Sequence, residues 1–400
     1  MHHEPKFGSQ IMLLAWSLLR GPVCIHSLTL NSHSISIQLS DLSFLYKHVF
    51  QGELSNNKKL KQSDTSFKFL TLPSIQLAAS CVLFSAQSVS SLTTKGDTTY
   101  ALVLMFPSSF ASKFASFHSV AFSFIHKSAY SVLSSLNASS LLDSVIDNIN
   151  TPLINLVTFS VSLFSLPPIP CSFEDSVLAY FTPSDSSFID LFSILLSSFL
   201  STGSLLLISN DLDVCNKWSG GLQSFVIRKS DKIMCAGHNN NTFIPGLIMQ
   251  SCSFLPQNLS KMIDKPLTIV EFVDCFTFKI KQTPLSPWFK QREELNQSNL
   301  DNDVPVSLLT KSAMSSDVMD FSTQFFKLPA PLRLAYLESW LQSRWRLALS
   351  LVIEVSQSRS NLNSIQAPHS YLLNMAENLC VNFWSSFENL KASQALSMFM

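Results

Sequence analysis

Twenty consecutive residues, from Leu191 to Asn210, carry no charged side chain. A stretch of this length can cross a bilayer, so one interpretation is a membrane anchor at 191–210. The internal pattern favours another, because apolar residues recur at helical spacing up to Gly203 and a short apolar run follows at 205–208. Glycine suits the left-handed end of a helix, and an unbroken apolar run suits a strand covered on both faces. We therefore predict a helix, a glycine stop and a buried strand, and keep the membrane anchor as the alternative.

Composition sets the class of protein. The chain has 400 residues, which is enough for two or three packed units. Apolar residues make up 46% and charged residues only 14%, so the cores are large and the surface must be rich in serine and asparagine. Lysine and arginine together number 27, as do aspartate and glutamate, and no basic face accumulates. Binding to nucleic acid is therefore not expected.

The sequence has none of the common catalytic or nucleotide-binding signatures. It contains nine glycines and neither a Gly-x4-Gly-Lys-Ser/Thr loop nor a Gly-x-Gly-x2-Gly turn. It also lacks a Gly-x-Ser-x-Gly elbow and a His-Glu-x2-His helix. We therefore predict no catalytic residue, no cofactor and no resident metal, so the chain is not expected to be an enzyme.

The cysteines and the N-terminus indicate a cytoplasmic protein. The eight cysteines are scattered without a Cys-x2-Cys pair, which favours free thiols in a reducing compartment over a disulfide framework. The apolar run at 11–19 is short and ends at Gly21-Pro22 without a small-residue cleavage motif, so no signal peptide is predicted.

Alternating apolar stretches and turn residues predict the elements of the first 140 residues. A strand pair, Leu13–Trp16 and Cys24–Leu30, surrounds the Gly-Pro turn, and a helix capped at Ser40-Asp41 runs toward Glu53. The remaining elements are strands at Phe67–Leu72, Ile75–Phe84 and Tyr100–Phe106 and a helix from Phe114 to Ser128.

Helical periodicity dominates the rest of the chain. An amphipathic helix is expected within 141–170, where Pro167-Pro168 ends it. Further elements are a helix at Leu212–Val226 capped by Asn210 or Asp211, strands at Phe243–Gln250 and Leu267–Phe276, and a polar loop at Thr283–Val304. The strongest helix follows Pro331, with an apolar stripe of Leu334, Leu337, Leu341, Trp345, Ala348, Leu349 and Val352. The last helix runs through Leu372, Met375, Leu379, Phe383 and Phe387.

Four short patterns follow one another between residues 16 and 107. They are Trp16-x4-Gly21-Pro22, Phe44-Leu45-x2-His48-x3-Gly52-Glu53-Leu54, Lys68-Phe69-x2-Leu72 and Thr99-Tyr100-x-Leu102-x4-Pro107. This ordered set resembles the longin domain of the DENN-module family of the chromosome-9 open reading frame linked to amyotrophic lateral sclerosis and frontotemporal dementia. The resemblance continues more weakly through Gly246-Leu247-x2-Gln250 and Leu255-Pro256.

The resemblance implies an α/β (α+β) fold with a longin domain, an α/β central DENN subdomain and a helical distal DENN subdomain. The corresponding boundaries are a longin domain at 11–142, a linker helix with a Pro-rich turn at 143–172, the central subdomain at 173–282 and the distal subdomain at 283–400.

The resemblance also implies a function. Proteins of this family pair with a second, larger DENN protein from the Smith-Magenis region and with a WD40-repeat protein. The complex regulates small GTPases of the Rab and Arf families, by GTPase activation or nucleotide exchange, in autophagy, endosomal trafficking and lysosome signalling. The chain would be a non-catalytic subunit in the cytoplasm, recruited to lysosome or endosome surfaces, with the GTPase-activating arginine on the partner.

Two residues are candidates for a surface that faces a partner or the GTPase. Trp16 is a large aromatic side chain next to a turn, which is typical of an interface anchor, although an aromatic residue of this size equally suits the core of the domain. Leu54 follows the Gly52-Glu53 end of the first helix and could instead pack against that helix end. His48 and Gly52 match the family pattern, but a histidine on the inner helix face and a helix-ending glycine are also ordinary structural residues.

Three weaker candidates remain. Cys235-x2-His238 together with Cys252 could supply three zinc ligands, but buried thiols beside a loop histidine explain them more simply. The pair Asp211-x-Asp213 could hold a divalent ion, although its place before a helix favours a cap and turn. Arg20 beside the Gly-Pro turn could act as an arginine finger, but the family carries no arginine there and a solvated side chain is the simpler interpretation.

Overall fold

A computed structural model of the chain divides into two compact units, residues 1–165 and 166–400, which are considered separately. The residues that the structure describes are 9–17, 21–30, 39–51, 65–87, 97–138, 142–167, 169–183, 186–226, 235–239, 243–256, 259, 263, 266–283, 307–308, 315–357, 370–380, 383 and 386–387. The polar loop expected at 283–304 lies almost wholly outside them.

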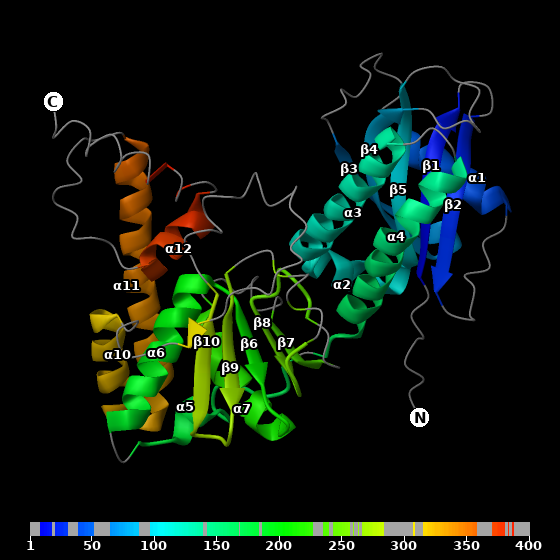
Figure 1. Cartoon of the computed structure of the whole chain (residues 1–400). Helices are drawn as coiled ribbons and strands as arrows, with labels where there is room; N and C mark the ends of the chain where they lie inside the picture. The colour runs from blue at the N-terminus through cyan, green and yellow to red at the C-terminus, as the bar shows by residue number, and fades with distance from the viewer. Residues whose placement is uncertain are drawn as a thin grey trace. The chain divides into compact units, whose positions relative to one another are not determined.

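The first unit is built on an antiparallel sheet (Figure 1). Its strands follow the order β2-β1-β5-β4-β3. Strand β1 is apolar on both sides, and its residues from Ile11 to Ala15 are fully buried or nearly so. The bounds are β1 Ser9–Ser17, β2 Gly21–Leu30, β3 Ser66–Leu72, β4 Leu77–Gln87 and β5 Asp97–Pro107. All five predicted strands are confirmed, and the predicted start at Ile75 is corrected because Pro73–Ile75 forms a 3₁₀ turn before β4.

Helices cover both faces of this sheet. Helix α1 (Leu39–Phe50) packs its apolar side on one face, where its Leu45 and Val49 join a core cluster with β1, β4 and β5. Helices α3 (His118–Ala138) and α4 (Leu142–Ser165) lie side by side, with α3 against β4 and α4 against β1 and β2 (Figure 1). The single helix expected from Phe114 is instead two, because α2 (Ala111–Ser116) ends before α3 begins.

Helix α4 is the amphipathic helix predicted within 141–170, and it ends before Pro167 as expected. It contacts α3 and the first sheet and therefore belongs to the first unit. The division into four domains remains a prediction.

The second unit contains a mixed sheet in the order β11-β10-β9-β6-β8-β7. Strands β7, β8, β6 and β9 run parallel to one another, whereas β10 is antiparallel to β9 and β11 to β10. The bounds are β6 Leu205–Ile208, β7 Cys235–Asn239, β8 Met249–Cys252, β9 Thr268–Phe272, β10 Phe278–Gln282 and β11 Ser307–Leu308.

The strand predicted at Phe243–Gln250 is wrong over most of its length, since only its last two residues enter β8. Gly246 has a φ of 84°, which places a turn in the middle of the apolar stretch. The Gln250 side chain then forms the two backbone hydrogen bonds with Ile244 that a neighbouring strand would otherwise form. Its Oε1 accepts from the Ile244 N–H and its Nε2 donates to the Ile244 carbonyl, each at 3.0 Å.

The long uncharged stretch is resolved as helix α6 (Ser186–Thr202), Gly203 and strand β6, as predicted. Gly203 has a φ of 69°. The α6 hydroxyls have protein partners, because Ser198 and Thr202 each hydrogen-bond to the Thr268 hydroxyl, at 2.7 and 2.9 Å. None of the helices in the described part of the chain has the length and apolar character needed to cross a membrane. The anchor alternative is therefore not retained.

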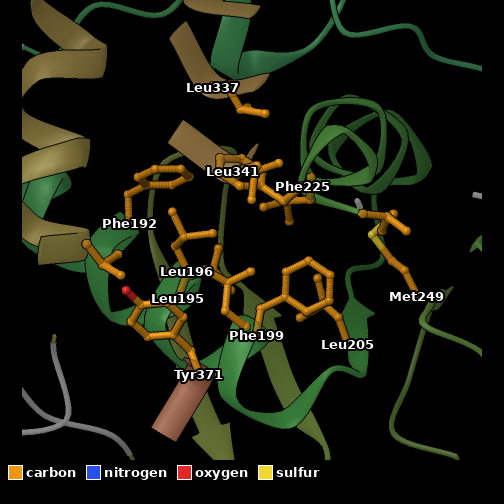
Figure 2. Packing of buried hydrophobic residues seen from close by; sticks show 14 of the residues in the cluster. Phe192, Leu195, Leu196, Phe199, Leu205, Phe225, Met249, Leu337, Leu341 and Tyr371 are labelled. Carbon is orange, nitrogen blue, oxygen red and sulfur yellow. The ribbon is translucent and has the colours of Figure 1, made fainter. Parts of the chain in front are cut away.

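The described part of the second unit also contains helices α5 (Val177–Tyr180), α7 (Leu212–Leu222), α10 (Ser316–Lys327), α11 (Ala330–Ser356) and α12 (Ser370–Leu379). Helix α6 is central to their packing, since it contacts α10, α12 and β9. Figure 2 shows Phe192, Leu195 and Phe199 of α6 in the core with side chains of α11 and of strands β6 and β8.

The predicted stripe of α11 requires correction. Leu337, Leu341 and Ala348 are buried, but Leu349 is 45% exposed. Buried Leu351 and Val355 extend the stripe toward the C-terminus of the helix. At its N-terminal end the stripe includes a charged residue, Arg333, which is only 2% exposed.

Candidate functional site

Trp16 is the last but one residue of β1 and pairs with Pro22 of β2. Its side chain is half-buried at the margin of the core cluster under α1. The indole ring is 5.5 Å from the Phe50 ring, at an interplanar angle of 56°. One part of the ring therefore packs against the end of α1, and the remaining part is open to solvent.

A side chain from strand β3 holds the C-terminal end of helix α1. Lys68 on β3 donates from its Nζ to the carbonyl oxygens of Val49 at 3.1 Å and Gln51 at 2.6 Å. An ammonium group satisfies the last carbonyls of a helix and interacts favourably with its dipole. Two of the four sequence patterns, the one that includes Val49 and the one that begins with Lys68, thus meet at one structural point.

The second candidate, Leu54, lies outside the described residues, and so do Gly52, Glu53 and Arg20. His48 is half-buried, and its ring is 4.3 Å from that of the exposed Phe44 in an edge-on contact. This aromatic pair lies on α1, the helix that ends at Phe50 beside Trp16.

Two titratable groups of the first unit, Tyr46 on α1 and Cys24 on β2, interact with each other. Burial raises the pKa of Tyr46 to about 12, and Cys24 adds to the rise. Burial also raises the pKa of the Cys24 thiol. The Tyr46 hydroxyl lies 3.8 Å from Met12 Sδ. Both groups therefore stay protonated at neutral pH, and neither is an activated acid, base or nucleophile.

The proposed zinc ligands are separated by the second sheet. Cys235 belongs to the large core that includes Leu205 and Met249, whereas Cys252 belongs to the cluster on the other face with Leu206 and Ile208. Both thiols are buried in apolar surroundings. The interpretation of these cysteines as core residues is therefore the better one.

Asp211 and Asp213 form a helix cap. Asp211 is the N-cap of α7, and its Oδ1 accepts from the Asp213 N–H at 2.9 Å. The Asp213 carboxylate pairs with Lys217 one turn later, at 2.6 Å. Both carboxylates thus have the roles expected at a helix start.

Sequence reasoning missed the group that holds the helices of the second unit together. The Arg333 guanidinium donates from Nη1 to the carbonyls of Leu178, Ala179 and Phe181, at 3.0, 3.2 and 2.7 Å. Its Nε donates to the Leu328 carbonyl at 3.1 Å. A sequence signal existed, since Arg333 precedes Leu337 and Leu341 at four-residue intervals.

A second network joins α10, α11 and α12. The Asp317 carboxylate accepts from Arg344 Nη1 at 3.1 Å and from the Tyr371 hydroxyl. The Arg344 guanidinium also lies over the Trp340 ring. These networks stabilise the helical region and have no evident catalytic arrangement.

The described residues thus form a mixed α/β protein with two sheet-centred units. The chain belongs to the C9orf72-like protein family, whose model matches residues 44–285, more than half of the sequence. A search of curated proteins found no match.

Proposed function

We propose that this chain is the non-catalytic subunit of a DENN heteromeric complex that regulates small GTPases. The observation that carries the proposal is the extent of the family match, which begins in α1 of the first unit and ends just after β10 of the second. The match therefore includes parts of both sheet-centred units. In the proposal, the unit with α1 is a longin domain and the second unit comprises the central and distal DENN subdomains.

The first unit has the element order that a longin domain requires. Two strands, a helix, three strands and further helices follow one another, and the sheet is antiparallel throughout. In the second unit, a largely parallel sheet precedes three helices, α10 to α12. This order is the one expected of a central subdomain followed by a helical distal subdomain.

The partners in this proposal are a larger DENN protein, a WD40-repeat protein and GTPases of the Rab and Arf families. Trp16 and Leu54 face a partner or the GTPase. The half-exposed indole, held on one side by Phe50, is suited to this role because large, partly preorganised aromatic side chains are frequent binding hot spots. The proposed setting is the cytoplasm, with recruitment to lysosome or endosome surfaces during autophagy and trafficking.

In the proposal, the subunit regulates and the catalytic arginine comes from a partner. Arg333 is buried and bound to five backbone carbonyls, and Arg344 is paired with Asp317, so both guanidinium groups have structural roles. In the proposal, the arginine that stabilises the transition state of GTP hydrolysis comes from the larger DENN partner.

Co-expression with the larger DENN protein and the WD40-repeat protein tests this proposal. We expect the three chains to elute together in size-exclusion chromatography at micromolar concentration, and we expect Trp16→Ala to reduce the fraction of this chain in the complex or the action of the complex on its GTPase. Elution of the wild-type chain as a monomer beside a complex of the other two would contradict the proposal.

A further inference from the structure

The carboxyl ends of three neighbouring parallel strands, β9, β6 and β8, meet at one edge of the second sheet. The segments that leave these strands carry large, exposed apolar side chains. With the last residue of α5, they provide six of the thirteen large apolar side chains that are exposed in the described residues. We name these six the carboxyl-edge patch: Tyr180, Leu212, Phe254, Leu255, Val273 and Phe276. Isolated exposed apolar residues are common, but their concentration at this edge of an α/β sheet marks an interaction site.

The turn between β9 and β10, which carries part of the patch, is held in a fixed conformation. The Trp218 indole N–H donates to the Cys275 carbonyl at 2.9 Å. The Asp274 carboxylate accepts from the Phe276 N–H at 2.8 Å. The Phe276 ring stacks on Phe181 with a centroid distance of 4.3 Å. Because the surface is formed before a partner arrives, binding requires little ordering of the patch itself.

Carboxylates adjoin this part of the patch, because Asp213 follows Leu212 and Asp274 follows Val273. Burial raises the pKa of the Cys275 thiol, the Lys217 ammonium opposes the rise, and the carboxylates of Asp213, Asp274 and Asp211 add to it. Within the described residues, three carboxylates and one ammonium thus act on this thiol. Lys217 is already paired with Asp213, so the charge of these four described groups is negative.

The negative charge selects among the possible occupants. A second copy of the chain would bring like charges together, and an anionic lipid surface would be repelled in the same way. A segment with basic side chains beside an apolar face would match both the apolar patch and its carboxylates. We propose that the carboxyl-edge patch binds a partner protein through an amphipathic segment that presents apolar side chains flanked by lysine or arginine.

This inference goes beyond the proposed GTPase regulation, and it requires neither Trp16 nor a GTPase. A partner that binds here could belong to the same complex or to another assembly. What the surface determines is the chemistry of the segment, which is apolar and basic.

Two designed helical peptides provide the test. Both have leucine on one face, but one has lysine and the other glutamate on the opposite face. Fluorescence anisotropy with the full chain measures their dissociation constants. We expect saturable binding of the lysine peptide, with a dissociation constant that rises at higher salt. The glutamate peptide should bind at least about tenfold more weakly.

Matched variants locate the binding surface. The patch variant combines Leu212→Ser with Asp213→Asn, and the control combines Leu347→Ser with Glu354→Gln on α11. Leu212 and Leu347 have nearly equal exposed fractions, 48% and 46%. We expect the patch variant to bind the lysine peptide about tenfold more weakly and the control to bind like the wild type, because an apolar contact and a charge pair are lost together.

A third variant keeps the test decisive if the first loses stability. Val273 is 72% exposed, so Val273→Lys should fold normally. It should weaken binding of the lysine peptide and strengthen that of the glutamate peptide. Equal binding of both peptides, or equal loss in the patch and control variants, would overturn the proposal. Self-association of the chain that Val273→Lys abolishes, or binding to phosphatidylserine vesicles, would overturn it as well.

Discussion

The Arg333 guanidinium donates to the Phe181 carbonyl oxygen at 2.7 Å, across a sequence separation of 152 residues. This bond and those to Leu178 and Ala179 satisfy the carbonyls at the end of α5, while the Leu328 carbonyl at the end of α10 is bound by the same side chain. A guanidinium group has five donors in a fixed fork, so it can bind several backbone segments at once. Arg333 thus links α5, α10 and α11.

Replacement of Arg333 by methionine should therefore destabilise the second unit strongly. The buried carbonyls would lose their donors, and we expect a loss of about 3 kcal/mol or more in the free energy of unfolding. Urea unfolding followed by circular dichroism measures this loss. Arg346→Met on the exposed side of α11 is the matched control, and similar losses in both variants would contradict the structural role of Arg333.

Gly203 should not tolerate alanine. Its φ of 69° is unfavourable for a residue with a Cβ, and an added Cβ would lie 2.9 Å from Asn374 Nδ2. We expect Gly203→Ala to cost about 1 to 3 kcal/mol in unfolding free energy.

The double variant Gly203→Ala/Asn374→Ala separates the two causes. It removes the close contact but also the hydrogen bond from Asn374 to the Leu200 carbonyl, which is 2.7 Å long. A double-mutant cycle with Asn374→Ala alone corrects for that loss. If the loss of unfolding free energy in the double variant equals the sum of the losses in the two single variants, the contact between the added Cβ and Asn374 does not contribute.

Stability should fall at alkaline pH. Burial raises the pKa of Cys81 and of Cys215 to about 12, from a reference value of 9.0. Because the unfolded chain releases these protons at lower pH than the folded chain, the stabilisation is complete below pH 9 and is lost as the pH rises toward 12. Unfolding free energies measured between pH 7 and about pH 10.5 should decrease, and Cys81→Ala should flatten the decrease. If the unfolding free energy of Cys81→Ala decreased with pH as steeply as that of the wild type, the raised pKa of Cys81 would not be a cause of the decrease.

Trp16→Ala should affect binding more than folding. The half-exposed ring makes only part of its contacts with the core, so we expect a modest decrease in melting temperature. If Trp16 is a binding hot spot, the action of the complex on its GTPase should weaken by about 2 kcal/mol or more. Trp16→Phe is the control, because it keeps an aromatic contact with Phe50. A large loss of stability with normal binding by the remaining folded protein would identify Trp16 as a core residue only.

Much of the fold could be predicted from periodicity and turn residues. The first strand pair and the helix–Gly203–strand unit are confirmed because their signals are local, but Gly21 and Pro22 belong to β2 itself and do not form the predicted turn. The strand expected at Phe243–Gln250 failed because Gly246 turns the chain inside an apolar stretch, and the pairing of Gln250 with Ile244 depends on that turn. An apolar run alone does not distinguish a strand from a buried turn.

The stripe of α11 shows a second limit of sequence reasoning. Arginine is rarely buried, so the apolar pattern does not predict Arg333 in the core although it lies four residues before Leu337. Its burial depends on carbonyls from α5, which are about 150 residues away in the sequence. The carboxyl-edge patch was missed for a similar reason, since the order of strands in the sheet brings its residues to one edge.

The rate of GTP hydrolysis by Rab and Arf GTPases tests the central claim most directly. It should be measured with the larger DENN protein and the WD40-repeat protein, in the presence and absence of this chain, together with the rate of nucleotide exchange. We predict that one of the two rates increases only when the chain is present and that Trp16→Ala reduces the increase. A folded chain that forms no complex with these proteins and changes neither rate would contradict the account.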